Sequence, residues 1–161
     1  MGRLLPLFVI AATFVVASMM NVYPLSFALA SYRPMMLILV LIFWAMYQPK
    51  YVGVGIAFLV GLAADLLLDT HLGHQAFCAV VAVFVIRVMT VYAKRLSFSS
   101  AWILTTVALS VYRLFLWLFQ SFAHEGFSLT GFLSFVVSLL IFPVVWWVLM
   151  RANRRISPRI F

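Results

Sequence analysis

The chain alternates between long apolar stretches and short breaks. The breaks fall at 24–34, 48–50, 69–74, 94–97 and 124–126, where prolines, glycines, histidines or charged residues gather. A helix that crosses a bilayer needs about 20 mostly apolar residues, and the stretches between the breaks approach that length. The pattern therefore predicts six transmembrane helices: Leu4–Tyr23, Pro34–Tyr47, Tyr51–Leu68, Gln75–Ala93, Ser99–Ala123 and Ser128–Met150.

The first two helices each leave an alternative open. The second is short for a full crossing, so either it begins within residues 27–32, or Arg33 and Gln48 reach the interfaces with their side chains. The first stretch has a competing interpretation as a signal peptide, because Arg3 precedes it and the A-x-A pattern of residues 28–30 follows it. Its apolar part is long for a signal peptide, so we expect a retained transmembrane helix.

Composition favours a membrane protein over the common soluble classes. Of 161 residues, 67% are apolar and only 9% are charged, whereas a soluble domain is about half apolar and a quarter charged. The same figures exclude disordered and coiled-coil proteins, and the single Cys78 excludes an intrachain disulfide. No connection is long enough to form a soluble domain. The sequence thus predicts an all-α integral membrane protein with one six-helix domain over residues 1–161.

The basic residues indicate how the helices are oriented. With six crossings both termini share a side, and that side receives eight of the 11 Lys and Arg residues, while the other receives only Arg33. Since cytoplasmic loops carry the excess of Lys and Arg, both termini are predicted to be cytoplasmic. The net charge of +8 therefore reflects topology. The eight residues are Arg3, Lys50, Lys94, Arg95, Arg151, Arg154, Arg155 and Arg159.

Three ionisable side chains fall within the predicted helices: Asp65, Arg87 and Arg113. Each is costly in hydrocarbon and should face protein, water or an interface. Asp65 and Arg113 both lie roughly 21 Å from the cytoplasmic ends of their helices, and Arg87 only roughly 10 Å. We therefore predict a buried ion pair between Asp65 and Arg113, with Arg87 near the inner interface. The alternative for Asp65 is direct binding of a partner or ligand.

Small and polar residues follow single faces of three predicted helices. The third helix has a four-residue repeat that favours a close-packed seam: Gly53, Ala57, Gly61 and Asp65. The fifth has a longer polar stripe that should face the bundle interior or a partner and not lipid: Ser99, Trp102, Thr106, Ser110, Arg113, Trp117 and Gln120. The sixth carries Gly131, Ser134 and Ser138 on one face, and Pro143 should kink it.

The residue patterns do not indicate an enzyme. The chain has three acidic residues and lacks the H-E-x-x-H, phosphate-loop and G-x-S-x-G patterns. Asp69, His71 and His74 have ligand chemistry, but they lie in a loop without a fourth ligand, so no metal site and no cofactor are expected. The basic tail should contact anionic lipids or an acidic partner, and not nucleic acid, through Arg151, Arg154, Arg155 and Arg159.

Three motifs follow one another in the first half of the chain. Arg33-Pro34 opens the second helix, a basic turn follows at 48–50, and a G-x-x-x-D…L-G block comes next. This order resembles the MreD family of rod shape-determining membrane proteins. The first helix and the last three resemble the family only in hydropathy and length. The resemblance marks four candidate structural or functional positions: Gly61, Asp65, Leu72 and Gly73. The depth argument adds Arg113 as a possible partner of Asp65.

This resemblance implies a non-enzymatic inner-membrane component of the bacterial peptidoglycan elongation complex. MreD-like proteins associate with the bitopic protein MreC and act with RodA, a class B penicillin-binding protein and the actin-like MreB. Their fold is similar to that of the substrate-binding subunits of energy-coupling-factor transporters. A small-molecule binding or transport subunit with a pocket near Asp65 is therefore the alternative, although fold alone does not transfer function.

Overall fold

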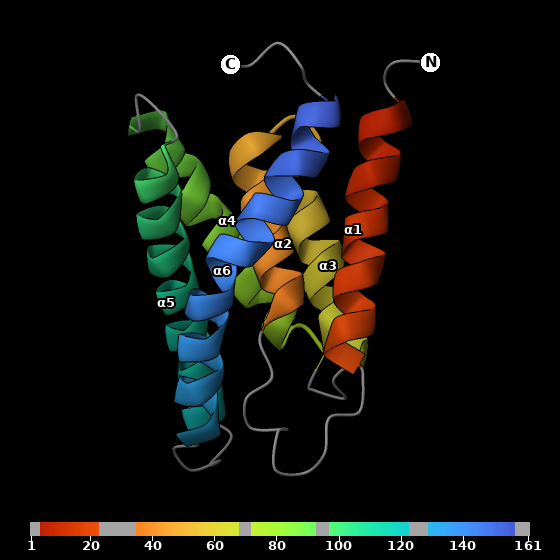
Figure 1. Cartoon of the computed structure of the whole chain (residues 1–161). Helices are drawn as coiled ribbons and strands as arrows, with labels where there is room; N and C mark the ends of the chain where they lie inside the picture. Colours follow the sequence, from red (N-terminus) through yellow and green to blue (C-terminus); the bar gives the residue numbers. More distant parts are fainter. Residues whose placement is uncertain (1–3, 23–34, 68–71, 93–96, 123–128, 157–161) are drawn as a thin grey trace.

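A computed structural model describes residues 4–22, 35–67, 72–92, 97–122 and 129–156, and these residues form a bundle of α-helices (Figure 1). The all-α prediction is confirmed for this part of the chain. The helices, in chain order, are α1 (Leu4–Val22), α2 (Met36–Tyr47), α3 (Val54–Leu67), α4 (His74–Tyr92), α5 (Phe98–Phe122) and α6 (Leu129–Ile156).

Most predicted helix bounds agree with the structure, and α3 and α6 differ most. Residues 48–53 form a turn, so α3 begins at Val54 and not at Tyr51. Helix α6 continues beyond the predicted end at Met150 to Ile156, because its basic tail contains Arg and Ala, which favour helix. Pro143 lies inside α6, which changes direction along its length in Figure 1, as expected for a helix with a missing backbone donor. An extension of α2 into residues 27–32 lies outside the described residues.

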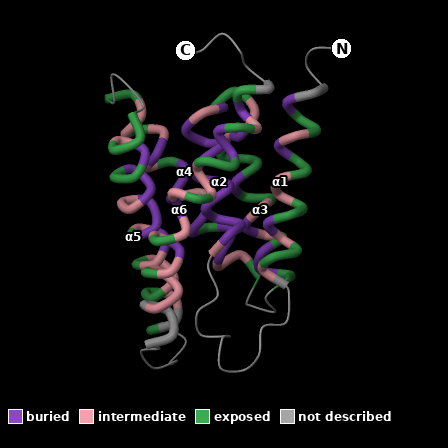
Figure 2. The backbone as a smooth tube through the Cα atoms, viewed as in Figure 1, coloured by how far each residue is buried: buried purple, intermediate pink, exposed green. Residues whose placement is uncertain are grey.

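Helix α2 is the core of the bundle. Its residues from Met36 to Met46 are all buried, and it contacts each of the other helices (Figure 2). A helix that is apolar on every side has no face that favours water, so it lies either in a protein core or in lipid, and here the other helices surround it. At 12 residues it is about 18 Å long, too short to cross about 30 Å of hydrocarbon alone.

Hydrogen bonds from side chains fasten α2 to α1 and α6. At its start the Met35 N–H donates to Ser138 Oγ over 2.9 Å, which satisfies one of the backbone donors that a helix leaves unpaired. At its end Gln48 is buried and its Nε2 donates to Asn153 Oδ1 over 3.0 Å. One interpretation of the sequence had the Gln48 side chain reaching the membrane interface. The structure instead buries this side chain against Asn153. The other bonds run from Trp44 Nε1 to Thr13 Oγ1 and from Trp146 Nε1 to the Tyr47 hydroxyl.

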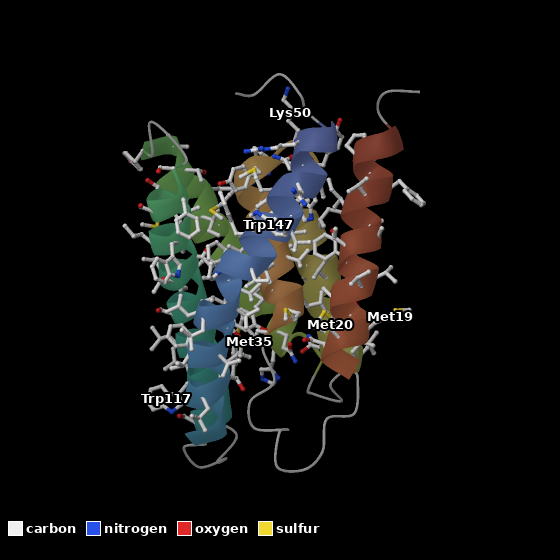
Figure 3. The ribbon with its side chains drawn as sticks, in the orientation of Figure 1. Met19, Met20, Met35, Lys50, Trp117 and Trp147 are labelled. Carbon is white, nitrogen blue, oxygen red and sulfur yellow. The ribbon has the colours of Figure 1, made fainter. Side chains whose placement is uncertain are left out.

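The described helices have the length and surface of a membrane protein. Three of them are long and apolar enough to span a bilayer by length and composition, within His74–Tyr92, Phe98–Phe119 and Leu133–Arg154, and the apolar stretches of the other three are shorter. The start of α1 and the end of α6 lie at the same end of the bundle (Figure 1). Lys50 lies at this end too, whereas Trp117 and Met35 lie toward the other (Figure 3).

The predicted small-residue seam of α3 is confirmed as its contact with α4. Ala57, Gly61 and Asp65 are buried, and α3 packs more extensively against α4 than against any other helix. A Cβ on Gly61 would lie 2.8 Å from the backbone nitrogen of Ala76 and from the backbone oxygen of Gln75. Neither backbone atom can move aside, so glycine is required where the two helices approach.

We predict that Gly61→Ala lowers the free energy of unfolding by about 1–3 kcal/mol, the usual cost of overpacking. The matched control is Gly55→Ala in the same helix, because a Cβ there would meet nothing within 4 Å. That control should be neutral or slightly stabilising, since alanine favours helix. Thermal unfolding of the purified variants in detergent measures both. Equal stability of the two variants would contradict the close approach of α3 and α4.

Candidate functional site

The candidate site lies where the end of α3 meets the start of α4. Asp65 is 1% exposed, and its carboxylate accepts hydrogen bonds from three backbone N–H groups. The N–H groups of Gly73 and Ala76 donate to Oδ2 over 2.8 and 3.3 Å, and that of Gln75 donates to Oδ1 over 3.0 Å. Asp65 thus caps the N-terminus of α4 from another helix, where a negative charge also interacts favourably with the helix dipole.

The loop residues of the G-x-x-x-D…L-G block have distinct places at this cap. Gly73 has φ +98°, a left-handed conformation that side chains disfavour, and it directs its N–H to Asp65. Leu72 is 68% exposed, so its side chain is not part of the core. Gly61, Asp65 and Gly73 are therefore explained by helix packing and capping, whereas Leu72 presents an apolar side chain to the surroundings of the bundle.

A third helix joins the cap through the Gln75 side chain. The Tyr112 hydroxyl of α5 donates to Gln75 Oε1 over 3.2 Å, and both residues are buried. The contacts of Gly61, Asp65, Gln75 and Tyr112 thus connect α3, α4 and α5. Sequence reasoning missed Gln75 and Tyr112 as site residues. The available signal was the need of α4 for an acceptor at its start, because the first N–H groups of every helix have no partner within it.

The predicted ion pair between Asp65 and Arg113 is not present among the described residues, and this interpretation was wrong. The carboxylate is held by backbone donors, and Arg113 Nη2 is buried without a hydrogen-bond partner. Asp65 and Arg113 lie at similar depths along their helices, but depth does not determine the direction in which a side chain points. The two charges therefore do not meet. Successive helical residues point about 100° apart, and it is Tyr112 that α5 turns toward α4.

The polar stripe of α5 faces away from the bundle. The buried residues of this helix lie on the opposite side: Ala101, Leu104, Thr105, Ala108, Leu109 and Tyr112. Along the stripe, Trp102 and Trp117 are 43% and 46% exposed, Ser99 and Ser110 are exposed, and Thr106 and Arg113 are half-buried. Of the two predicted settings, the bundle interior is wrong. The side chain of Gln120 lies outside the described part of the chain.

Arg87 lies at the other end of α4, as its predicted depth required. Its Nη2 donates to the backbone oxygen of Pro49 over 2.7 Å and would lie 3.2 Å from a Cβ on Gly53. Its Nε is buried without a hydrogen-bond partner. The guanidinium therefore fixes the turn between α2 and α3 against α4, and it lies beside Pro49, which precedes Lys50 in the chain.

The basic tail continues α6 at the same end. Arg151 lies over the ring of Trp147, with Cζ 4.6 Å from the ring centroid, and both side chains are exposed. Arg154 is exposed as well. The side chain of Arg155 and the whole of Arg159 lie outside the described residues. Contact of this tail with anionic lipids or an acidic partner stays a prediction.

The side chains near the site that have nucleophile or ligand chemistry are Cys78 and His74. Cys78 is fully buried and packs in the core. The His74 ring lies edge-on against Phe119, with centroids 4.7 Å apart, and Asp69 and His71 lie outside the described residues. Within the residues that the structure places, three or more His, Cys, Asp or Glu side chains do not gather at metal-binding distance.

We predict that Asp65→Ala destabilises the protein strongly, because each buried N–H left unpaired costs about 1–3 kcal/mol. Asp65→Asn should cost less, since its amide keeps one acceptor oxygen. Arg113→Ala should be additive with Asp65→Ala in a double-mutant cycle, as expected for residues that do not interact. Unfolding of the purified variants in detergent provides the measurement. A coupling of more than about 1 kcal/mol between the two positions would restore the ion pair.

Comparisons with known proteins identify the family. The family model described as rod shape-determining protein MreD matches residues 1–152. A rod shape-determining protein MreD of Haemophilus influenzae is 27% identical over 151 residues, which cover 93% of each chain. Solved structures give no match, so the likeness to energy-coupling-factor subunits stays a prediction. Because the family model covers nearly the whole chain, with the α3–α4 cap inside it, the chain belongs to the MreD family of rod shape-determining proteins.

Proposed function

We propose that the chain is a non-enzymatic scaffold or regulator of the peptidoglycan elongation complex in the bacterial inner membrane, and that it acts with MreC. The observation that carries this proposal is the MreD family match over residues 1–152, which supports a role in cell shape. RodA, a class B penicillin-binding protein and MreB are the further partners, reached directly or through MreC. In this proposal the chain binds these proteins and holds them together, and it does not catalyse a reaction.

The surface of the described residues supports a scaffold. Large apolar side chains are exposed along five of the helices, and the fully buried α2 is the exception. Such a body offers partners two kinds of surface: the outer faces of helices within the bilayer and the charged end around Lys50, Arg151 and Arg154. Partners that are themselves membrane proteins fit the first kind, because helix faces pack well against other transmembrane helices.

The geometry at Asp65 weakens the alternative of a small-molecule binding or transport subunit. Both carboxylate oxygens accept hydrogen bonds from the backbone, and the residue is 1% exposed. A ligand that used this carboxylate would have to displace the cap of α4. A structural role explains the acid without a ligand, so the scaffold is the function that the site supports best.

We predict that both chain termini and Lys50 are cytoplasmic, because basic residues gather on the inner side of the membrane. Single cysteines placed at Arg154 and at Lys50 should react with a membrane-impermeant thiol reagent only after the inner membrane is opened. The natural Cys78 is buried and serves as the unreactive background. Labelling of either site in intact spheroplasts would contradict the proposed orientation.

Depletion of the chain in the rod-shaped bacterium that makes it should produce round cells, because wall elongation would lose its scaffold. MreC should still be made but should no longer assemble with RodA and the penicillin-binding protein. Microscopy and pull-down of MreC measure these two effects, with re-expression of the chain as the control. Unchanged rod shape after full depletion would refute the proposal. A loss of MreC itself would contradict the scaffold role, because it would show that the chain stabilises this one partner.

A further inference from the structure

The outer surface of α5 carries polar residues beside its most exposed large apolar side chains, which are Ile103 and Leu114. We define the α5 polar face by the described residues of the stripe: Ser99, Trp102, Thr106, Ser110, Arg113 and Trp117. For comparison, the outer face of α6 is wholly apolar where it is most exposed, with Leu140, Val144 and Val148 between 53% and 69% exposed. Lipid tails solvate the α6 face well, but they offer nothing to hydroxyl groups or to a guanidinium.

Arg113 is the residue for which lipid is the least suitable neighbour. It lies 15 residues after Phe98 and nine before Phe122, or about 22 and 14 Å from the two ends of α5. Its Nη2 is buried and has no hydrogen-bond partner. The guanidinium therefore lies against the protein instead of extending to the headgroups. A charged donor at this depth requires an acceptor, and none of the described side chains supplies a carboxylate to it.

The residues beside Arg113 shape a surface that suits a second helix. The hydroxyls of Thr106 and Ser110 donate to the backbone oxygens of Trp102 and Thr106 over 2.9 and 2.8 Å, so their protons are already satisfied. These two small side chains, four residues apart, allow a neighbouring helix to come close. Trp102 and Trp117 border them toward the two ends of α5, and Figure 3 shows Trp117 projecting away from the bundle.

We propose that the α5 polar face is the docking site for one transmembrane helix of a membrane partner, and that this helix carries an Asp or Glu at the level of Arg113. Charge complementarity selects this occupant, because Arg113 is only half-buried and a carboxylate can pair with the accessible side of its guanidinium. The proposal rests on the proposed function, which supplies MreC as the first partner to test.

A second copy of the chain is the less suitable occupant. The two copies would have the same orientation in the membrane, so a two-fold contact through this face would bring Arg113 close to the same residue of the other copy. Two like charges at close range in a medium of low dielectric repel strongly. A lipid phosphate is disfavoured by the buried Nη2, since a side chain that reached for the headgroups would expose that atom.

Photo-crosslinking locates the face in the assembled complex. A benzoylphenylalanine at Ser110 should crosslink to MreC in cells that produce both proteins, and the same group at Leu140, on the outer face of α6, should not. Crosslinks from Ser110 to a second copy of the chain, to lipid alone, or equal crosslinks to MreC from both positions would overturn the proposal.

Affinity purification of the chain with MreC then tests the charge. Arg113→Leu should lower the amount of MreC recovered by about three- to thirty-fold, the range of one interhelical polar contact in a membrane. Arg113→Lys should keep most of it, because the positive charge remains. Ser110→Phe should also lower recovery, whereas Ala63→Phe, at an exposed position of α3, should not.

The controls separate this proposal from the proposed function. The Ser110 and Ala63 variants should unfold in detergent at the temperature of the unmodified chain, because both side chains are exposed. Arg113 is half-buried, so a loss of MreC from Arg113→Leu supports docking when the unfolding temperature of that variant is unchanged, and contradicts it when the temperature falls together with the recovery of MreC. Failure of the unmodified chain to recover MreC would contradict the partnership and with it the docking site. Recovery of MreC that is unaffected by Arg113→Leu and Ser110→Phe would overturn the docking site alone and leave the partnership standing.

Discussion

The cap that Asp65 places on α4 is the interaction on which this half of the bundle depends. The first N–H groups of α4 are buried at Gln75 and Ala76, and a buried group left unpaired costs about 1–3 kcal/mol. The carboxylate of α3 accepts from Gly73, Gln75 and Ala76 at once. It can do so only because Gly61, one turn earlier, lets the backbones of α3 and α4 touch. Packing and capping therefore require one another.

The same requirement explains how the short α2 is accommodated. Its first turn receives Ser138 of α6 as an acceptor for Met35 N–H, and the turn that follows it is held by Asn153 and by Arg87. These contacts come from distant parts of the chain and replace water at both ends of the helix. The core of the molecule is thus an apolar helix with hydrogen-bonded polar groups at its two ends. A low-dielectric environment favours this arrangement, because unpaired polar groups are costly there.

A body of this kind is suited to binding other membrane proteins. Its buried polar groups are largely used to hold the bundle together. Among the described residues, exposed polar side chains lie on α5 and at the end of the bundle where α6 ends and Lys50 lies. A membrane scaffold needs this division, because its internal contacts must survive while partners bind and leave. A role of the MreD family in shape determination is consistent with a protein that binds partner proteins and positions them in the membrane.

The sequence by itself determined the helical class, the order of the helices, and the seam of α3, because apolar length and four-residue spacing are local properties. It also singled out Asp65 and the polar stripe of α5. It did not determine where either of them points. Periodicity shows that residues share a face, but only packing decides whether that face turns inward, and here packing buried Tyr112 and left Arg113 half-buried. Depth suggested a charged partner for Asp65, yet the tertiary structure supplied the N–H groups of Gly73, Gln75 and Ala76. The sequence shows that the start of α4 needs an acceptor, but only the packing of α3 against α4 decides that Asp65 provides it.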